Sequence, residues 1–344
     1  MRGSLSRWSV LLGVIGAVGP GCTSFDFPPP TPDAGVDSGL FQLADECTVD
    51  ITPITPVDVD VETTTIGLRS NLSSVGGTCT GGGLLGADGF FAIDVVAGER
   101  WHIDTLPVAG YESLDLALFI VRNCDTMANC RTFVNRCGPG GEEDLTIVFP
   151  TTERLFVGID AVSGEGNIEF LATPTHCGNG IPEEGETCDD GNMNNTDDCD
   201  TGCRQILHQP DPVEAELNNW AVEANVIELA AGAGNVHGTV TSECDDDHFV
   251  ISVAAGQTVT ARLLTTSGAP CTGTVVPGLR LLAPNGVERG TGTPGGMGGT
   301  CPSIEGLVLA TAGEYDLFVV PPPAPGGGMA YPPVTYQLAV SVTP

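Results

Sequence analysis

Two stretches that align without a gap decide the fold of this sequence: Ile93-Asp-Val-Val-Ala-Gly98-Glu-Arg-Trp-His-Ile103 and Ile251-Ser-Val-Ala-Ala-Gly256-Gln-Thr-Val-Thr-Ala261. In both stretches, apolar and polar residues alternate on either side of an Ala-Gly pair. Alternation with a period of two is typical of strands, and a glycine between them is typical of a tight turn. The chain is therefore expected to form the same pair of strands twice.

The repeat continues along the chain in the same order. Further alternating segments correspond in pairs: 114–120 with 279–282, 155–159 with 317–320, and 167–172 with 335–342. No segment shows a convincing helical period, and short strands separated by Gly and Pro turns are typical of β-sandwiches and jelly rolls. We therefore predict an all-β protein with two jelly-roll or β-sandwich domains of one plan, at 46–173 and 210–344.

The amino-acid composition excludes some classes of binding partner for this protein. The chain has 344 residues, with 44 acidic residues against 12 basic ones and a net charge of −32. A nucleic-acid binder needs a basic surface to displace counterions from phosphate, so that class is excluded. Electrostatic docking on an anionic membrane is excluded for the same reason. Divalent cations and basic partners stay compatible with this charge, whose simplest role is to keep an exported protein soluble.

The N-terminus has the pattern of an export signal. Arg2 and Arg7 precede an apolar run at 8–18 that is too short to span a bilayer. The small residues directly before Cys22 resemble a bacterial lipobox. This resemblance implies that residues 1–21 are a lipoprotein signal peptide and that Cys22 is lipidated and becomes the mature N-terminus.

A lipid at Cys22 predicts an outer-membrane or cell-surface lipoprotein that contacts the membrane through its anchor. The alternative is ordinary cleavage after Gly19, which would give a secreted protein. Residues 22–45 are rich in Pro, Gly and Asp. Such a stretch buries too little apolar surface to fold, so we expect a disordered linker.

The segment 177–204, between the two predicted domains, differs from both. Cys177, Cys188, Cys199 and Cys203 lie within it, together with eight acidic residues and very few large apolar ones. A segment this small without a core must be held together by disulfides or by a metal.

The stretch Cys177-Gly-Asn-Gly-Ile-Pro-Glu-Glu-Gly-Glu-Thr-Cys188-Asp-Asp-Gly-Asn resembles the myxococcal cysteine-rich repeat. That family forms a short disulfide knot in exported proteins of myxobacteria and their relatives. The match loosens after Asn192, because Asn195-Thr-Asp-Asp-Cys199 replaces the usual Gly-Asp-Gly-Cys.

The second predicted β domain resembles the bacterial pre-peptidase C-terminal domain, a jelly-roll module appended to secreted peptidases and many surface proteins. The matching segments are Glu214-Ala-Glu216-Leu-Asn218-Asn219, Gly238-Thr-Val240, Asp245-Asp-Asp247-His-Phe249, Ala255-Gly256-Gln257, Ala312-Gly313-Glu-Tyr315 and Tyr336-Gln-Leu338. The first domain is similar but more divergent. Together the two resemblances cover most of 46–344 and leave no room for a peptidase.

Calcium is the cofactor that this resemblance implies. In collagen-binding relatives of the module, a Glu-x-Glu-x-Asn segment and aspartates at the first long strand bind the ion, which takes six to eight oxygen ligands. The matching residues here are Glu214, Glu216, Asn218, Asn219, Asp245 and Asp247. The alternative is an acidic linker followed by an aspartate that caps a turn. The first domain has Gly89 in place of Asp247, so no calcium site is expected there.

A second candidate calcium site lies in the cysteine-rich segment. Its residues would be Asp190, Asn192, Asn194 and Asp198. Their spacing copies the first ligand positions of an EF-hand, but Asn195 and Thr201 replace the required glycine and glutamate, so an EF-hand is rejected. A calcium-stabilised disulfide loop and a solvated turn both remain open.

The cysteines are expected to form disulfides, because export favours oxidation and the paired Cys-x-x-Cys spacing of zinc sites is absent. The twelve that follow Cys22 are Cys47, Cys79, Cys124, Cys130, Cys137, Cys177, Cys188, Cys199, Cys203, Cys244, Cys271 and Cys301. The pairs predicted within domains are Cys47–Cys79, Cys124–Cys130 and Cys271–Cys301. This leaves Cys137 and Cys244, which would be linked directly or through the repeat, or would stay free.

Catalytic motifs are missing from the sequence. It has no Gly-x-Ser-x-Gly elbow, no His-Glu-x-x-His and no phosphate-binding loop. The scattered histidines include His102 and His248, which are expected to pack on strands or to face solvent. We therefore predict a non-enzymatic surface lipoprotein that binds an extracellular protein or polysaccharide. A structural envelope spacer and a docking subunit of a secreted peptidase are the alternatives.

Overall fold

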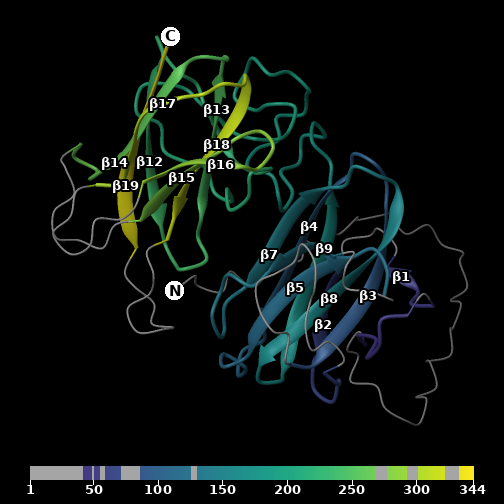
Figure 1. The fold of residues 1–344 in the computed structure, drawn as a ribbon. Helices are drawn as coiled ribbons and strands as arrows, with labels where there is room; N and C mark the ends of the chain where they lie inside the picture. Colours follow the sequence, from purple (N-terminus) through teal and green to yellow (C-terminus); the bar gives the residue numbers. More distant parts are fainter. Residues whose placement is uncertain are drawn as a thin grey trace, which may run out of the picture. The chain divides into compact units, whose positions relative to one another are not determined.

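The structure is a computed structural model of the chain, and it shows an all-β protein (Figure 1). It describes residues 42–48, 50–54, 59–70, 86–124, 130–268, 277–292, 301–321 and 333–344, which contain no helix. All of them belong to one compact unit, residues 39–344. The predicted signal peptide 1–21, the anchor Cys22 and most of the linker 22–45 lie outside the described residues. In the part of the chain that is described, no helix could span a membrane.

The first sandwich consists of two sheets in which the strand pairs are antiparallel, except for one parallel pair formed by a short edge strand. One sheet has the order β1 (Pro53–Ile54), β3 (Asp88–Val95), β8 (Glu153–Ser163), β5 (Asp115–Val121) and β6 (Cys130–Val134). The other has the order β2 (Val59–Thr64), β9 (Asn167–Thr175), β4 (Arg100–Pro107) and β7 (Glu143–Val148). Apolar side chains of both sheets, among them Phe91, Trp101 and Phe170, meet in one core.

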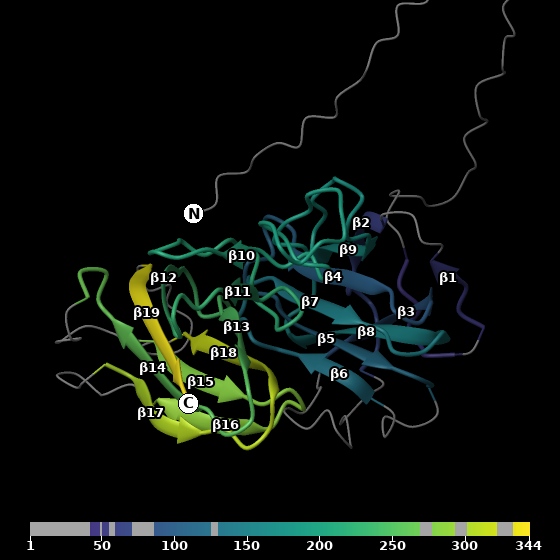
Figure 2. The same ribbon diagram turned by 90° about the horizontal axis from the view of Figure 1, so that it is seen from above.

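The second sandwich repeats this arrangement, and its strands are drawn mostly green to yellow in Figure 2. One sheet has the order β10 (Ile206–Leu207), β11 (Asn225–Ile227), β13 (Asp247–Val253), β18 (Gly313–Val320), β15 (Gly278–Leu282) and β16 (Glu288–Gly292). The other has the order β12 (Ala233–Val240), β19 (Val334–Thr343), β14 (Thr258–Leu264) and β17 (Ser303–Val308). From β11 onward, each strand has a counterpart in the first sandwich at the same place in its sheet.

The strand pairing refines the alignment of the two copies. Ile93 pairs with Leu155 in the first sandwich, whereas Ile251 pairs with Tyr315 in the second. Leu155 therefore corresponds to Tyr315, two residues before the position that the sequence alignment gives it. Because side chains alternate between faces, a shift of two residues leaves the buried face unchanged.

The first sandwich buries both faces of its β3–β8–β5 sheet. Phe91 points into the main core, while Phe90 and Phe119 belong to a second apolar cluster on the other face. Residues from the N-terminal segment pack against this second cluster. Leu43 is buried in the main core, and Ala44 forms a bridge with Phe90. The sandwich thus already includes residues that the sequence analysis assigned to the linker.

Two of the predicted disulfides are wrong. Cys47 is bonded to Cys124, instead of Cys47 to Cys79 and Cys124 to Cys130. The reason is the course of the N-terminal segment, which packs on the outer face of the sheet and reaches the end of β5. The partner of Cys130 lies outside the described residues, as do Cys79 and Cys271.

The direct bond between Cys137 and Cys244 is confirmed. The repeat is closed by Cys177–Cys203 and Cys188–Cys199. Cys301 is also disulfide-bonded, to a partner outside the described part of the chain, and no described cysteine is free. Proteins with this many disulfides form them in oxidising compartments, so the protein is extracytoplasmic.

Candidate metal centre

Three carboxylates of the second sandwich come together at one point. Glu214 and Glu216 lie on the segment between β10 and β11, and Asp247 is the first residue of β13. One carboxylate oxygen of each lies within 4.8 Å of the others. We call this group the carboxylate site. Sequence reasoning named all three residues as calcium ligands, and the fold brings them together from positions more than thirty residues apart in the chain.

Glu214 is held firmly at the carboxylate site by strand β12. Its backbone NH donates to the carbonyl of His237 over 3.0 Å, and its Oε1 accepts a hydrogen bond from the NH of Thr239 over 2.6 Å. Between these two residues, Gly238 leaves the space that the Glu214 carboxylate and the ring of Tyr336 occupy. A Cβ at position 238 would lie 2.5 Å from Glu214 Oε2 and 2.2 Å from the Tyr336 hydroxyl.

The buried hydroxyl of Tyr336 lies between two carboxylates. It is 3.0 Å from Glu214 Oε2 and 2.6 Å from Asp247 Oδ2. A phenol has a single proton to donate, so it can satisfy only one of these oxygens. The second close oxygen–oxygen contact needs a proton on the carboxylate or a cation nearby.

Other buried polar atoms around the carboxylate site have no partner. Asp247 is fully buried, and its Oδ1 accepts no hydrogen bond. Asn218 is also fully buried, with neither its amide oxygen nor its amide nitrogen hydrogen-bonded. Among the described residues, Glu214 and Asp247 form no ion pair with a basic side chain. The backbone carbonyl of Asn218 accepts a hydrogen bond from the NH of His248, the residue after Asp247, so the unpaired amide lies on a segment beside the carboxylate site. Carboxylate and amide oxygens are the ligands that calcium prefers.

The electrostatics of the carboxylate site agree with this interpretation. Burial, followed by the charge of Glu216, raises the pKa of Glu214 to about 8. Burial, followed by the charges of Glu214 and Asp245, raises the pKa of Asp247 well above its usual value. Without a cation, each carboxylate therefore makes its neighbours harder to ionise.

Without calcium, the protein should become more stable as the pH falls from about 8 to about 5. Because the pKa of Glu214 is raised to about 8 from 4.5, the folded state holds a proton that the unfolded state has lost, and stability falls as the pH rises through this window. Asp160, whose burial beside Asp88 raises its pKa to about 8, acts in the same direction. Melting temperatures in chelator across this range would test the effect. Glu214→Gln should flatten the slope, and an unchanged slope would contradict the assignment.

Two predicted ligands have other contacts. Asp245 Oδ2 accepts hydrogen bonds from the backbone NH and the hydroxyl of Thr241. Asn219 offers its carbonyl to Arg136 over 3.2 Å, and its side-chain oxygen is buried without a partner. Gly238 and Tyr336 were not predicted to belong to the site, although a tyrosine at an apolar position of a strand indicates a buried hydroxyl that needs a partner.

The four residues of the second candidate calcium site form hydrogen bonds with their own loop and with His208. Asp190 accepts a hydrogen bond from the NH of Asn192. The amide nitrogens of Asn192 and Asn194 both donate to Asp197 Oδ2, each over 3.2 Å. Asp198 lies 3.1 Å from the ring of His208. These contacts are typical of a hydrogen-bonded turn. They do not bring the four side chains together around one point.

The repeat also contains a group formed by Glu186, Asp189 and Cys203. Cys203 is bonded to Cys177, so it offers no thiolate. Asp189 accepts four backbone NH groups, two on each oxygen. With its oxygens already satisfied, this carboxylate organises the turn of the repeat.

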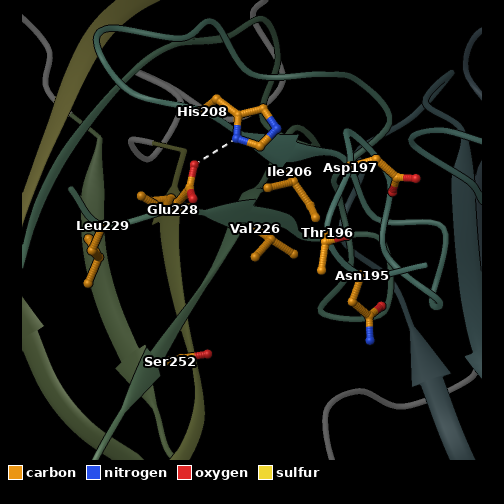
Figure 3. Close-up of a pocket in the computed structure, with 10 residues that line it drawn as sticks. Asn195, Thr196, Asp197, Ile206, His208, Val226, Glu228, Leu229 and Ser252 are labelled. Carbon is orange, nitrogen blue, oxygen red and sulfur yellow. Dashed lines mark hydrogen bonds and ion pairs between the residues drawn. The ribbon is translucent and has the colours of Figure 1, made fainter.

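A pocket of about 390 Å³ opens beside the repeat (Figure 3). Its lining includes the outward-facing side chains Ile206 of β10, Val226 of β11 and Ser252 of β13, together with the loop at 195–197. At its rim, His208 Nδ1 lies 2.7 Å from Glu228 Oε2. The lining contains no residue of the carboxylate site, so the two features are separate.

No family model and no curated protein matches this sequence. Several solved structures are similar in parts. A periplasmic inhibitor of g-type lysozyme from Aeromonas hydrophila, PliG, is 18% identical and matches 39% of this chain and 100% of its own, with a TM-score of 0.26. The pre-peptidase C-terminal domain of a Bacillus anthracis collagenase is 11% identical and matches 35% of this chain and 91% of its own, with a TM-score of 0.25. A tandem CBM22 domain of Paenibacillus barcinonensis Xyn10C is 9% identical over 87% of this chain and 95% of its own, with a TM-score of 0.21. With scores this low, they support no conclusion about function.

Proposed function

We propose that this protein is a non-catalytic binding module of the cell surface or outer membrane, held by a lipid at Cys22 and stabilised by calcium in its second sandwich. The observation that carries the calcium assignment is the carboxylate site. Asp247 is fully buried and Glu214 is half-buried, and neither has a basic partner among the described residues. Such carboxylates are costly to bury, and a divalent cation offsets that cost. Bound calcium would connect the segment that carries Glu214 and Glu216 to Asp247 at the start of β13.

The anchor and the linker define how such a module would work. A lipidated Cys22 holds one end at a membrane, and one acyl chain alone gives only marginal binding, so stable anchoring requires more than one chain. The linker gives the two sandwiches reach. Their loops and sheet faces then contact an extracellular protein or polysaccharide. The absence of catalytic motifs in the sequence supports a non-enzymatic role.

Thermal unfolding of the purified protein in calcium and in chelator tests this proposal. A ligand that binds only the folded state stabilises it by about 2.7 kcal/mol at a hundredfold excess over Kd. We expect an increase in melting temperature of several degrees with calcium. Magnesium should give a smaller increase, because it requires a tighter octahedral set of ligands.

Matched variants locate the effect. Glu216→Gln and Asp247→Asn should abolish the increase, whereas Asp190→Asn and Asp198→Asn should leave it unchanged. An increase that survives Asp247→Asn would place calcium elsewhere in the chain. No increase in the unmodified protein would show that the carboxylates are neutralised by protons, and the spacer interpretation would then be preferred.

A further inference from the structure

One arginine of the first sandwich contacts both chain segments that form the carboxylate site of the second. Arg136 Nη1 donates to the carbonyl of Asn219 over 3.2 Å, and its Nη2 donates to the carbonyl of Cys244. Its Nε lies 3.6 Å from Asp246 Oδ2. Its guanidinium carbon is 4.9 Å from the centre of the Trp220 ring. A single side chain therefore joins the segment after β10 to the segment before β13.

The contacted backbone positions lie next to the calcium donors. Asn219 directly follows Asn218, whose buried amide has no partner, and Cys244 lies three residues before Asp247. The planar guanidinium has donors at fixed angles, so it sets the position of one carbonyl relative to the other. A movement of Arg136 would therefore change the separation of the two groups of calcium donors.

Arg136 is itself held in place. The backbone NH groups of Arg136 and Cys137 both donate to the carboxylate of Glu143, at 3.0 and 2.7 Å, and Glu143 is almost completely buried. The next residue, Cys137, is bonded to Cys244. On the other segment, Trp220 Nε1 donates to Asp144 Oδ2 over 2.8 Å. The first sandwich thus holds both segments by several independent contacts.

We propose that Arg136 is a positioning residue for the calcium site, so that cation binding in the second sandwich and docking of the first sandwich are coupled. This inference rests on the proposed calcium function. Coupling of this kind is reciprocal: the docked first sandwich strengthens calcium binding, and calcium tightens the junction by the same factor. The site is therefore completed by a domain that supplies none of its carboxylates.

Calcium titration calorimetry of the whole protein tests the coupling. Arg136→Ala should weaken calcium binding about tenfold, within the range typical of coupled sites. Arg136→Lys should restore little of it, because one ammonium cannot reproduce the two-carbonyl fork. The matched control is Arg262→Ala, which removes an exposed arginine of the second sandwich that pairs with Glu305. It should bind calcium like the unmodified protein.

A fluorescence measurement gives a second readout. Calcium should change the emission of Trp220 in the unmodified protein, and this change should be lost in Arg136→Ala. If Arg136→Ala fails to fold, Trp220→Phe keeps an aromatic ring beside Arg136 but removes the indole NH that donates to Asp144, and it reduces the area of the ring. This variant should weaken calcium binding about threefold, a smaller share of the same coupling.

The outcomes separate the two proposals. Equal calcium affinity in the unmodified protein and in the Arg136 and Trp220 variants would overturn the coupling and leave the calcium site standing. No calcium binding by the unmodified, folded protein would overturn the calcium site and the coupling together.

Discussion

Replacing His102 with Gln should destabilise the protein by roughly 3–5 kcal/mol, the usual cost of breaking a buried ion pair. His102 is buried on β4, with its Nε2 3.5 Å from Asp104 and its Nδ1 3.7 Å from Glu223. Burial alone would lower its pKa, but the two carboxylates outweigh it and raise the pKa to about 10. The imidazolium therefore contributes a positive charge beside the fully buried Glu223, in addition to that of Arg100, and Gln cannot replace it.

The stability that His102 contributes should decrease as the pH rises. A histidine whose pKa rises from 6.5 to about 10 on folding contributes stability that is complete below 6.5 and is lost as the pH rises through 10. Urea unfolding at about pH 6, 8 and 10 in excess calcium would measure it. The difference between the unmodified protein and His102→Gln should shrink across this range. The double variant with Glu223→Gln should recover much of the loss, and a gap that stays constant with pH would contradict the ion pair.

Gly238→Ala should abolish the calcium-dependent increase in melting temperature and cost about 1–3 kcal/mol, as overpacking of a core does. The added Cβ would lie 2.2 Å from the Tyr336 hydroxyl and 2.5 Å from Glu214 Oε2. Both partners are fixed, because Tyr336 is buried and Glu214 is bonded to the backbone of β12. The Glu214 carboxylate would have to move away from Asp247.

The matched control for this variant is Gly278→Ala on β15 of the same sandwich. A Cβ there would meet its nearest neighbour, Val320 Cβ, at 3.5 Å, which is an ordinary contact. Melting curves of both variants with calcium and with chelator would be compared. A normal calcium response in Gly238→Ala would show that the site tolerates displacement of Glu214, and that the packing around Tyr336 is not part of it.

Local sequence patterns were sufficient to predict the architecture. The hairpins at Ile93 and Ile251 could be matched because alternation with a glycine turn depends only on neighbouring residues. The same reasoning placed Leu155 two residues away from its true counterpart, since alternation defines a face and not a register. The Cys47–Cys124 bond could not be predicted from local patterns. It depends on the path of the N-terminal segment across the sheet, and the distance between residues in the sequence does not define that path.

The carboxylate site could be predicted only in part. Glu214, Glu216 and Asp247 could be named from the resemblance to the pre-peptidase C-terminal domain, because they match its Glu-x-Glu-x-Asn segment and its strand aspartates. Tyr336 and Arg136 could not, since they reach the site through strand pairing and through contacts between sandwiches. His102 was expected to pack or face solvent, and its two carboxylate partners come from its own strand and from a segment more than a hundred residues later.

The Cys137–Cys244 bond has a mechanical consequence for an anchored protein. It spans a sequence separation of 107 residues, which include the entire repeat. A pulling force between an N-terminal anchor and a partner held by the second sandwich would pass across this bond and leave the enclosed chain unloaded. An extended chain spans about 3.3 Å per residue, so the enclosed chain would be roughly 350 Å long if it were pulled straight. The bond prevents this extension. A protease cut anywhere inside the loop would likewise leave both halves on the same tether.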